Sequence, residues 1–63
     1  MENDLKQRRA THDLSQAALG EAVDVSRQTI NAIERGRYDP SLELAFKLAA
    51  HFDCRIEDIF TPE

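Results

Sequence analysis

Three serines divide the middle of the sequence into segments that each open with a helix-start signal. Ser15, Ser26 and Ser41 all stand directly before a run of apolar residues at helical spacing. A serine hydroxyl in this position accepts one of the backbone N–H groups that a helix leaves unpaired at its start. None of the three has Glu or Gln three residues later, so a full capping box is absent. The pattern predicts short helices that begin after these serines.

The whole sequence is predicted to form five short helices, with no certain strand. The first spans about residues 3–12, with Asn3 as its N-cap, and the fifth spans about residues 56–60. The second and third follow Ser15 and Ser26, and the fourth, after Ser41, is the most apolar. The residues expected to face inward are Leu5, Leu19, Val23, Ile30 and Ile33, together with the Leu, Ile and Phe positions of the fourth and fifth helices.

Length and charge narrow the possible functions. A chain of 63 residues forms one domain at most, here residues 1–63, and leaves no room for a substrate cleft with a catalytic cluster, so an enzyme is not expected. The net charge of -4 argues against binding nucleic acid. The acids are unevenly placed, however: residues 41–63 carry five acids and two bases, whereas residues 1–40 are nearly balanced. A basic face therefore remains possible on the first part of the chain.

Cysteine usage and hydropathy bear on the compartment. Cys54 is the only cysteine, which excludes an internal disulfide and suits a reducing cytoplasm. No apolar run approaches the roughly 20 residues that span a bilayer, and the first residues are too polar for a signal peptide. His51 and Cys54 are three residues apart, but two ligands make a weak metal site, and a structural role is expected. We expect a cytoplasmic protein with no metal and no cofactor.

The segment from Gln16 to Ile33 carries the functional signal. Gly20 falls in the middle of a predicted helix, where it costs about 1 kcal/mol relative to Ala. Asp24 lies in a tight connection, and Asp tolerates a left-handed backbone better than most residues. Two helices that cross so closely that only a very small residue fits at the contact would explain both positions. This arrangement is a helix-turn-helix over about residues 16–35.

Four stretches extend this interpretation over nearly all of residues 5–60: LSQ at 14–16, VSRQTI at 25–30, NAIERGRYDPSLELA at 31–45 and IEDIF at 56–60. Together, and in this order, they resemble the Xre family of regulators, whose fold is that of the lambda-type repressors, and most of all its short stand-alone members. The resemblance implies an all-α, five-helix DNA-binding domain. The family usually has Gly where this chain has Asp24, and Ala or another small residue where it has Gly20; both departures suggest a less stable helix pair.

The resemblance also implies roles for individual residues. Arg27 lies in the first turn of the third helix and Glu34 near its end, against the preference of the helix dipole. In this fold the N-terminal residues of the third helix lie against the base edges of the major groove. Arg27 would then bind guanine, Gln28 would bind adenine, and Asn31 would reach another base. Glu34 would form a semi-buried ion pair with Arg9 of the first helix.

The remaining DNA contacts would be to phosphate. Gln16 matches the phosphate clamp of the family, and the other candidates are Ser26, Thr29, Arg35, Arg37 and Tyr38. Thr29 suits either phosphate or a thymine methyl. Arg35 and Arg37 follow the end of a helix, where bases are favourable in any case, so they complement the dipole or bind phosphate.

These expectations lead to two hypotheses. The first is a transcriptional repressor that binds double-stranded DNA as a homodimer, with half-sites about 34 Å apart, no small-molecule effector and no membrane partner. Its dimer contact would lie in the C-terminal third, at Ile56, Ile59 and Phe60, because a small domain has little interior for so many apolar groups. The second is an antitoxin-like module that binds a partner protein and regulates its own operon. A toxin partner is more often held by an added tail, and the sequence ends at Glu63.

Overall fold

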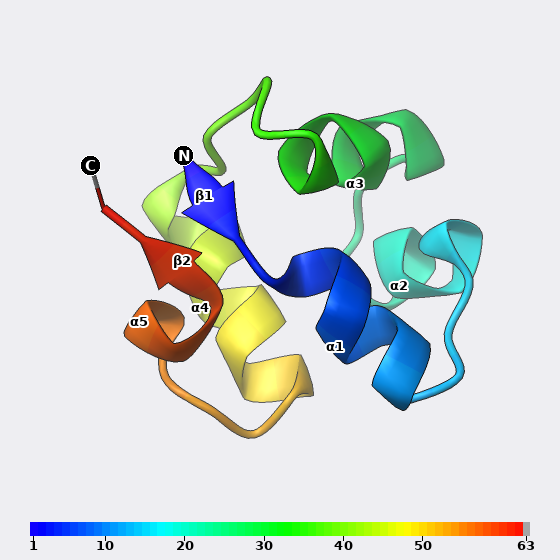
Figure 1. Ribbon diagram of the computed structural model, residues 1–63. Helices are drawn as coiled ribbons and strands as arrows, with labels where there is room; N and C mark the ends of the chain where they lie inside the picture. Colours follow the sequence, from blue (N-terminus) through cyan, green and yellow to red (C-terminus); the bar gives the residue numbers. More distant parts are fainter. Residues whose placement is uncertain (63) are drawn as a thin grey trace.

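The computed structural model describes residues 1–62 and contains the five predicted helices (Figure 1). Glu63, which was counted in the acidic C-terminal segment, lies outside the described residues. The elements are β1 (Glu2–Asn3), α1 (Leu5–Thr11), α2 (Gln16–Ala22), α3 (Arg27–Glu34), α4 (Leu42–His51), α5 (Ile56–Ile59) and β2 (Phe60–Thr61). The prediction of five helices is therefore confirmed, with a small sheet added to it.

That sheet corrects the prediction of no certain strand. β1 and β2 pair antiparallel, with Glu2 opposite Thr61 and Asn3 opposite Phe60, so the two ends of the described chain lie side by side (Figure 1). Strands of two residues leave no alternation for sequence analysis to detect. The first helix consequently begins at Leu5 rather than at residue 3. The N-cap is Asp4 rather than the predicted Asn3, and the Asp4 side chain makes no capping bond. The Asn3 side-chain oxygen instead accepts the Leu5 N–H at 3.1 Å.

The core lies where all five helices meet. Leu5, Leu19, Ile30, Ile33, Leu48 and Ile59 are the largest fully buried side chains. Two residues expected in this core are on the surface instead: Leu42 is 69% exposed and Phe46 is 59% exposed. They are one turn apart on α4, on a face that points away from Leu44 and Leu48. The fourth helix is therefore apolar on two sides, and only one of them packs against the protein.

The predicted serine caps are present at three helix starts. The Ser15 hydroxyl accepts the Ala18 N–H at 3.0 Å. The Ser26 and Ser41 hydroxyls each accept a backbone N–H three residues later at 3.2 Å. These bonds set where α2, α3 and α4 begin, and hence which residues occupy their first turns.

Four helices end in the same way. The residue after the C-cap has a left-handed backbone at Asp13 (φ 57), Asp24 (φ 63), Gly36 (φ 72) and Asp53 (φ 53). In each case the next N–H bonds back to a carbonyl in the last turn of the helix: Leu14 to Arg9, Val25 to Gly20, Arg37 to Ala32 and Cys54 to Ala49. This is the Schellman pattern. The sequence suggested a left-handed backbone at Asp24 but not at Asp13 or Asp53, since Gly is the usual residue at such positions.

Gly20 is required by the turn between α2 and α3. A Cβ added at Gly20 would lie 2.6 Å from the Val25 carbonyl oxygen and 3.3 Å from the Ser26 carbonyl. The close approach predicted for this glycine is therefore present, but the neighbour is the backbone of the turn rather than a side chain of α3. The backbone of the turn can pack this closely against α2 only because residue 20 has no side chain.

The left-handed turn residue provides a test of this packing. Asp24→Gly should raise the free energy of unfolding by up to about 1 kcal/mol, because Gly adopts positive φ without strain and removes an acid from a helix C-terminus. For a chain of this size, that corresponds to a rise of roughly 4–8 °C in Tm. Asp24→Ala is the control: it removes the same charge but keeps a Cβ, and should not be stabilising. A lower Tm for Asp24→Gly would contradict the proposed origin of the strain.

Candidate nucleic-acid interface

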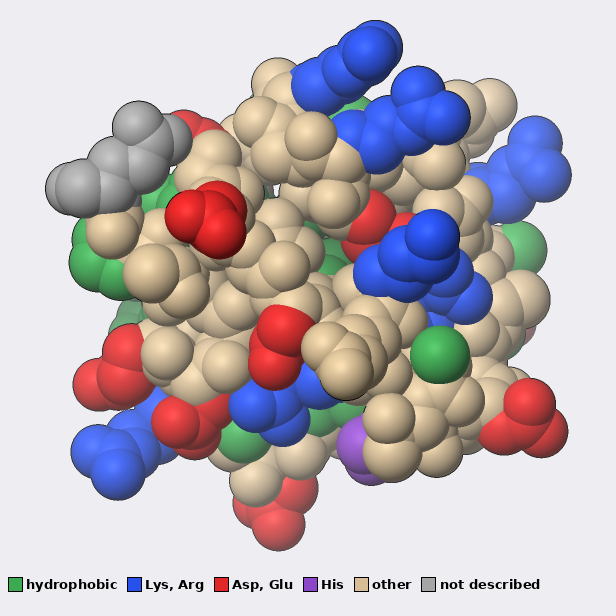
Figure 2. Space-filling view, viewed as in Figure 1, with side chains coloured by type: hydrophobic (Ala, Val, Ile, Leu, Met, Phe, Trp, Pro, Cys, Tyr) green, Lys and Arg blue, Asp and Glu red, His purple; other side chains and the backbone are tan. Residues whose placement is uncertain are grey.

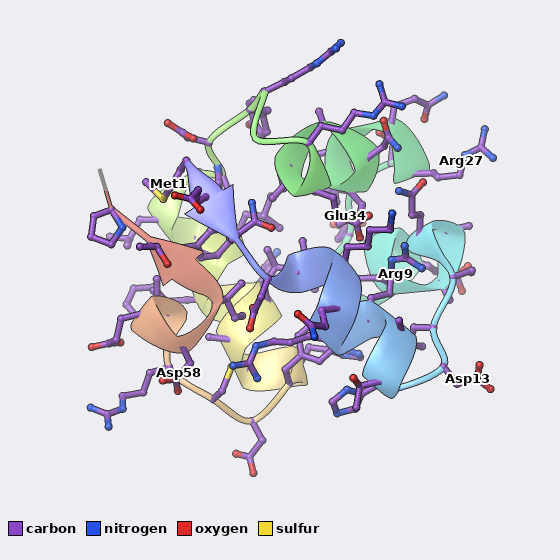
Figure 3. The ribbon with its side chains drawn as sticks, in the orientation of Figure 1. Met1, Arg9, Asp13, Arg27, Glu34 and Asp58 are labelled. Atoms are coloured by element: carbon purple, nitrogen blue, oxygen red, sulfur yellow. The ribbon has the colours of Figure 1, made fainter. Side chains whose placement is uncertain are left out.

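The predicted base-reading residues lie together at the N-terminal end of α3. Arg27 and Gln28 are exposed and Asn31 is half-buried. Figure 3 shows Arg27 at the start of the helix with its side chain directed away from the protein. All three residues line one surface groove with Gln16 of α2. Among the described residues, the side chains of Arg27, Gln28 and Asn31 have no hydrogen-bond or ion-pair partner, so their donors are available to a ligand.

Glu34, at the other end of α3, is held by an ion pair. Arg9 Nε donates to Glu34 Oε2 at 2.7 Å, and Arg9 Nη2 donates to Oε1 at 3.3 Å (Figure 3). Only 16% of the Arg9 side chain and 4% of the Glu34 side chain are exposed. The hydrogen bond from Arg9 to Glu34 raises the pKa of Arg9, and the nearby negative charge adds to this effect while burial opposes it. The ion pair expected from the family resemblance is thus present.

The same carboxylate also holds Gln16. Gln16 Nε2 donates to Glu34 Oε1 at 3.0 Å, and Arg9 Nη1 donates to the Leu14 carbonyl at 2.8 Å. Glu34 therefore connects α1, α2 and α3 through three side-chain donors. Because an amide group carries two N–H bonds, Gln16 keeps one donor after binding Glu34. This second role of Gln16 was missed by sequence analysis, which treated it only as a phosphate contact.

The hydroxyl groups at the start of α3 are partly used within the protein. The Ser26 hydroxyl caps the helix and lies 3.0 Å from the Thr29 hydroxyl. Thr29 is half-buried, whereas Ser26 is exposed. These two residues therefore fix the first turn, and only the remaining capacity of their hydroxyls is open to phosphate.

Basic side chains follow α3 into the next loop. Arg35, Arg37 and Tyr38 are all exposed, and Gly36 turns the chain between the two arginines. In Figure 2, Lys and Arg side chains gather over α3 and this loop, while much of the α5 side carries acids. Among the described residues, neither arginine has a side-chain partner, so both cations remain open to the surroundings.

The predicted dimer residues have a different environment from the one expected. Ile59 is 2% exposed and Phe60 is 4% exposed, and Ile56 is half-buried. Ile59 and Phe60 belong to the hydrophobic core of the chain, so these side chains have almost no surface to offer a partner. Leu42 and Phe46 are the exposed apolar side chains of α4. Their spacing of four residues already places them on one face of the helix.

His51 and Cys54 each pack against other parts of the protein. No group of three His, Cys, Asp or Glu side chains among residues 1–62 has the geometry to hold a metal ion. The His51 ring packs edge-on against Phe52 with centroids 5.0 Å apart, and burial raises the pKa of the half-buried Cys54 thiol. Both residues thus have structural surroundings.

The helices in the described part of the chain are all too short or too polar to cross a membrane.

Comparison with known proteins agrees with this geometry. A helix-turn-helix family model matches residues 5–59. The chain belongs to the helix-turn-helix family. Its members of this Xre-like type are DNA-binding regulators rather than enzymes. We therefore describe the protein as a helix-turn-helix transcriptional regulator.

Relatives and solved structures cover most of the chain. An uncharacterized HTH-type transcriptional regulator of Methanocaldococcus jannaschii is 59% identical over 63 residues, which is 100% of this chain and 96% of the relative. The Bacillus subtilis regulator YgzD is 50% identical, over 95% of this chain and 91% of its own. The P22 c2 repressor, solved with a synthetic operator, has a TM-score of 0.81 at 32% identity, covering 84% of this chain and 80% of that one. The restriction-modification controller protein of Aeromonas hydrophila has a TM-score of 0.80 at 30% identity, covering 89% and 85%.

The ion pair makes a direct stability prediction. Glu34→Leu should lower the free energy of unfolding by about 3 kcal/mol, because it leaves the mostly buried guanidinium of Arg9 without its carboxylate. Denaturant unfolding followed by circular dichroism measures this loss. Glu43→Leu is the matched control, because Glu43 is 80% exposed and lies 3.8 Å from Lys47; losing such a surface pair costs roughly 0–1 kcal/mol. Equal losses in the two variants would contradict the structural role of Glu34.

Proposed function

We propose that this regulator is a homodimeric repressor that inserts α3 into the major groove of a palindromic operator. The observation that carries the proposal is the group of exposed, unpaired donors on Arg27 and Gln28, beside Gln16, at the first turn of α3. In this proposal residues 1–63 act as one DNA-binding domain. Repression then requires only that the bound protein occupies promoter DNA.

The chemistry of each side chain suits a different part of DNA. Arginine donates two parallel N–H bonds to guanine O6 and N7, and a glutamine amide pairs in the same bidentate way with adenine. Arg27 and Gln28 would supply these contacts, and Asn31, one turn further on, would reach a third base. The structural similarity to the P22 c2 repressor, which was solved bound to a synthetic operator, supports this use of the fold.

Phosphate contacts would flank the base contacts on both sides. The free N–H of Gln16 lies at the start of α2, where the backbone also favours an anion. Arg35, Arg37 and Tyr38 lie beyond the other end of α3, so the two groups would hold phosphates on either side of the groove. Ser26 and Thr29 would add contacts through their remaining hydroxyl capacity.

The acidic net charge is compatible with this binding mode. Between residues 25 and 38, Glu34 is the only acid, and Arg9 neutralises it. Asp39, further along the same loop, pairs with the N-terminal amino group at 3.2 Å. Arg27, Arg35 and Arg37 are therefore left as uncompensated cations on the side that would meet DNA. The acids of the C-terminal segment would face away from the phosphates.

Arg27 provides the test of sequence reading. Arg27→Ala should abolish the preference for operator over scrambled DNA, because removing one bidentate pair with a base costs about 1–3 kcal/mol of discrimination. Arg27→Lys separates reading from charge, since Lys keeps the cation but lacks the planar fork. We expect Arg27→Lys to retain binding to scrambled DNA and still lose discrimination. Competition binding measures both quantities, and an unchanged preference in Arg27→Ala would refute the proposed reading role.

Arg37 provides the test of phosphate binding. Arg37→Ala should weaken binding to all sequences equally and reduce the slope of log K against log salt by about 1 for each phosphate that is no longer neutralised. If Arg37 only complemented the α3 dipole, Arg37→Ala would instead lower the stability of the protein and leave that slope unchanged. Titrations at four or five salt concentrations, with a thermal melt of the variant, distinguish the two roles.

A further inference from the structure

The loop that follows α3 has no anchor in the hydrophobic core. Residues 35–39 are all exposed, so no side chain of this loop packs inside the protein. The loop carries Arg35 and Arg37, which the proposed function places against phosphates. An arginine on a mobile backbone must be ordered when it binds, and this ordering lowers the affinity. The contacts that hold the loop in place are therefore relevant to DNA binding.

These contacts come from the first three residues of the chain. Asn3 Nδ2 donates to the Ile33 carbonyl at 2.9 Å and to the Met1 carbonyl at 3.3 Å. The N-terminal amino group pairs with Asp39 at 3.2 Å, but the two side chains are 35% and 64% exposed, and such surface pairs are weak. Asn3 is half-buried, and β1 runs between β2 and the loop (Figure 1). The bond from Asn3 to α3 is thus the stronger restraint.

We propose that Asn3 is a positioning residue for DNA binding. Its bond to the Ile33 carbonyl sets the direction in which the chain leaves α3, and so places Arg35 and Arg37 at the phosphates. This assignment rests on the proposed function, because Asn3 makes no DNA contact of its own and acts only through the two arginines. It gives β1 a role in the DNA interface, although the strand itself lies outside the helix-turn-helix.

The bond to α3 is not needed to satisfy the carbonyl that accepts it. The Ile33 carbonyl already accepts the Gly36 N–H at 2.9 Å, and the Arg37 N–H bonds to the Ala32 carbonyl at 3.0 Å. A carbonyl with one partner is not left unsatisfied when a second donor is removed. The donor on Asn3 therefore contributes geometry more than stability: it ties the last turn of α3 to a fixed point outside the helix.

That fixed point is attached to the core. Asn3 lies opposite Phe60 in the sheet, and the Asp4 N–H donates to the Ile59 carbonyl at 3.0 Å. Ile59 and Phe60 are both buried, so the backbone of β1 is held against residues that cannot move freely. The last turn of α3 is also held at Glu34 by the ion pair with α1. Two neighbouring residues of α3 are thus fastened to different elements just before the loop begins.

Asn3→Ser separates the two roles of this side chain. A serine hydroxyl can still accept the Leu5 N–H at the start of α1, but it is too short to reach the Ile33 carbonyl. We expect Asn3→Ser to weaken binding about fivefold, equally for selected and scrambled DNA. In a protein that already carries Arg35→Ala and Arg37→Ala, the same substitution should weaken binding no further, because residues that act through one another are not additive. The selected DNA is obtained with the wild-type protein from a random duplex pool.

Hydrogen exchange measures the position of the loop without DNA. In Asn3→Ser, the amides of Gly36 and Arg37 should exchange at least about threefold faster. The Val25 amide makes the corresponding bond at the end of α2 and should keep its wild-type rate. Phe52→Leu is the control for stability alone, since it alters the core at the opposite end of α4 from the loop. It should lower the Tm and leave both the DNA affinity and the relative exchange of these amides unchanged.

The double-substitution experiment decides the assignment. Equal weakening by Asn3→Ser with and without the two arginines would overturn it, because Asn3 would then act through some other part of the protein. Unchanged binding by Asn3→Ser in the wild-type background would overturn it as well. The proposed function is tested separately, by the proteins that keep Asn3. If the wild type selected no motif, or if the arginine substitutions alone left binding unchanged, the proposed DNA contacts would be refuted and the role of Asn3 with them.

Discussion

The carboxylate of Glu34 is the point on which the helix-turn-helix arrangement depends. It lies at the end of α3 and receives donors from Arg9 of α1 and Gln16 of α2. A carboxylate that is 4% exposed is costly to bury unless all its partners are in place. The described residues contain no buried polar side-chain atom that lacks a hydrogen bond. The three helices are therefore fixed together, because displacing any one of them would leave a buried charge or amide unsatisfied.

This network explains the reversed charges of α3. An acid at the C-terminal end of a helix opposes the dipole, but here the acid is neutralised by an arginine from another helix. The basic residue in the first turn has no such partner and remains exposed. At the C-terminal end of α3, the unfavourable charge of Glu34 thus serves tertiary structure. At the N-terminal end, the unfavourable charge of Arg27 remains free for a ligand.

The same three-residue pattern, an aspartate, an apolar residue and a serine, precedes both helices of the helix-turn-helix. Asp13, Leu14 and Ser15 join α1 to α2, and Asp24, Val25 and Ser26 join α2 to α3. In each, the aspartate takes the left-handed conformation, the apolar residue packs against the core, and the serine caps the next helix. The helix that follows opens with Gln16 in one case and Arg27 in the other. The same local chemistry therefore places a polar donor at the first position of both helices.

The parts of the fold that sequence analysis predicted are those with a local physical signal. The serine caps and the helical spacing of Leu19, Ile30 and Ile33 determine where the helices lie, and all five were found. The β1–β2 pair was missed because two residues carry no period. The left-handed Asp13 and Asp53 were missed because Asp is tolerated at such positions rather than selected for them.

In the candidate site, features set by the helix period could be predicted from the sequence, whereas contacts between distant residues could not. The exposed positions of Arg27 and Gln28 follow from the helix period, but the Arg9–Glu34 pair was expected only from the family resemblance, since its partners are 25 residues apart. Ile59 and Phe60 were assigned to a dimer contact by counting apolar residues against a small core. The burial of Ile59 and Phe60 leaves them almost no surface for such a contact, whereas Leu42 and Phe46 are apolar and exposed. Which of two apolar faces a helix buries is decided by its neighbours, and α4 has two such faces.

The acidity of the chain also has a consequence for selectivity in the proposed complex. If Arg35 and Arg37 each neutralise one phosphate, a dimer makes about four such contacts, and log K falls with log salt with a slope of roughly -4. That is a small electrostatic contribution for a DNA-binding protein, and the acidic remainder of the chain reduces it further. Binding to random DNA, which depends on this contribution alone, is weakened most. Contacts to the bases from Arg27 and Gln28 are unaffected, so a protein of net charge -4 can discriminate well while binding only moderately.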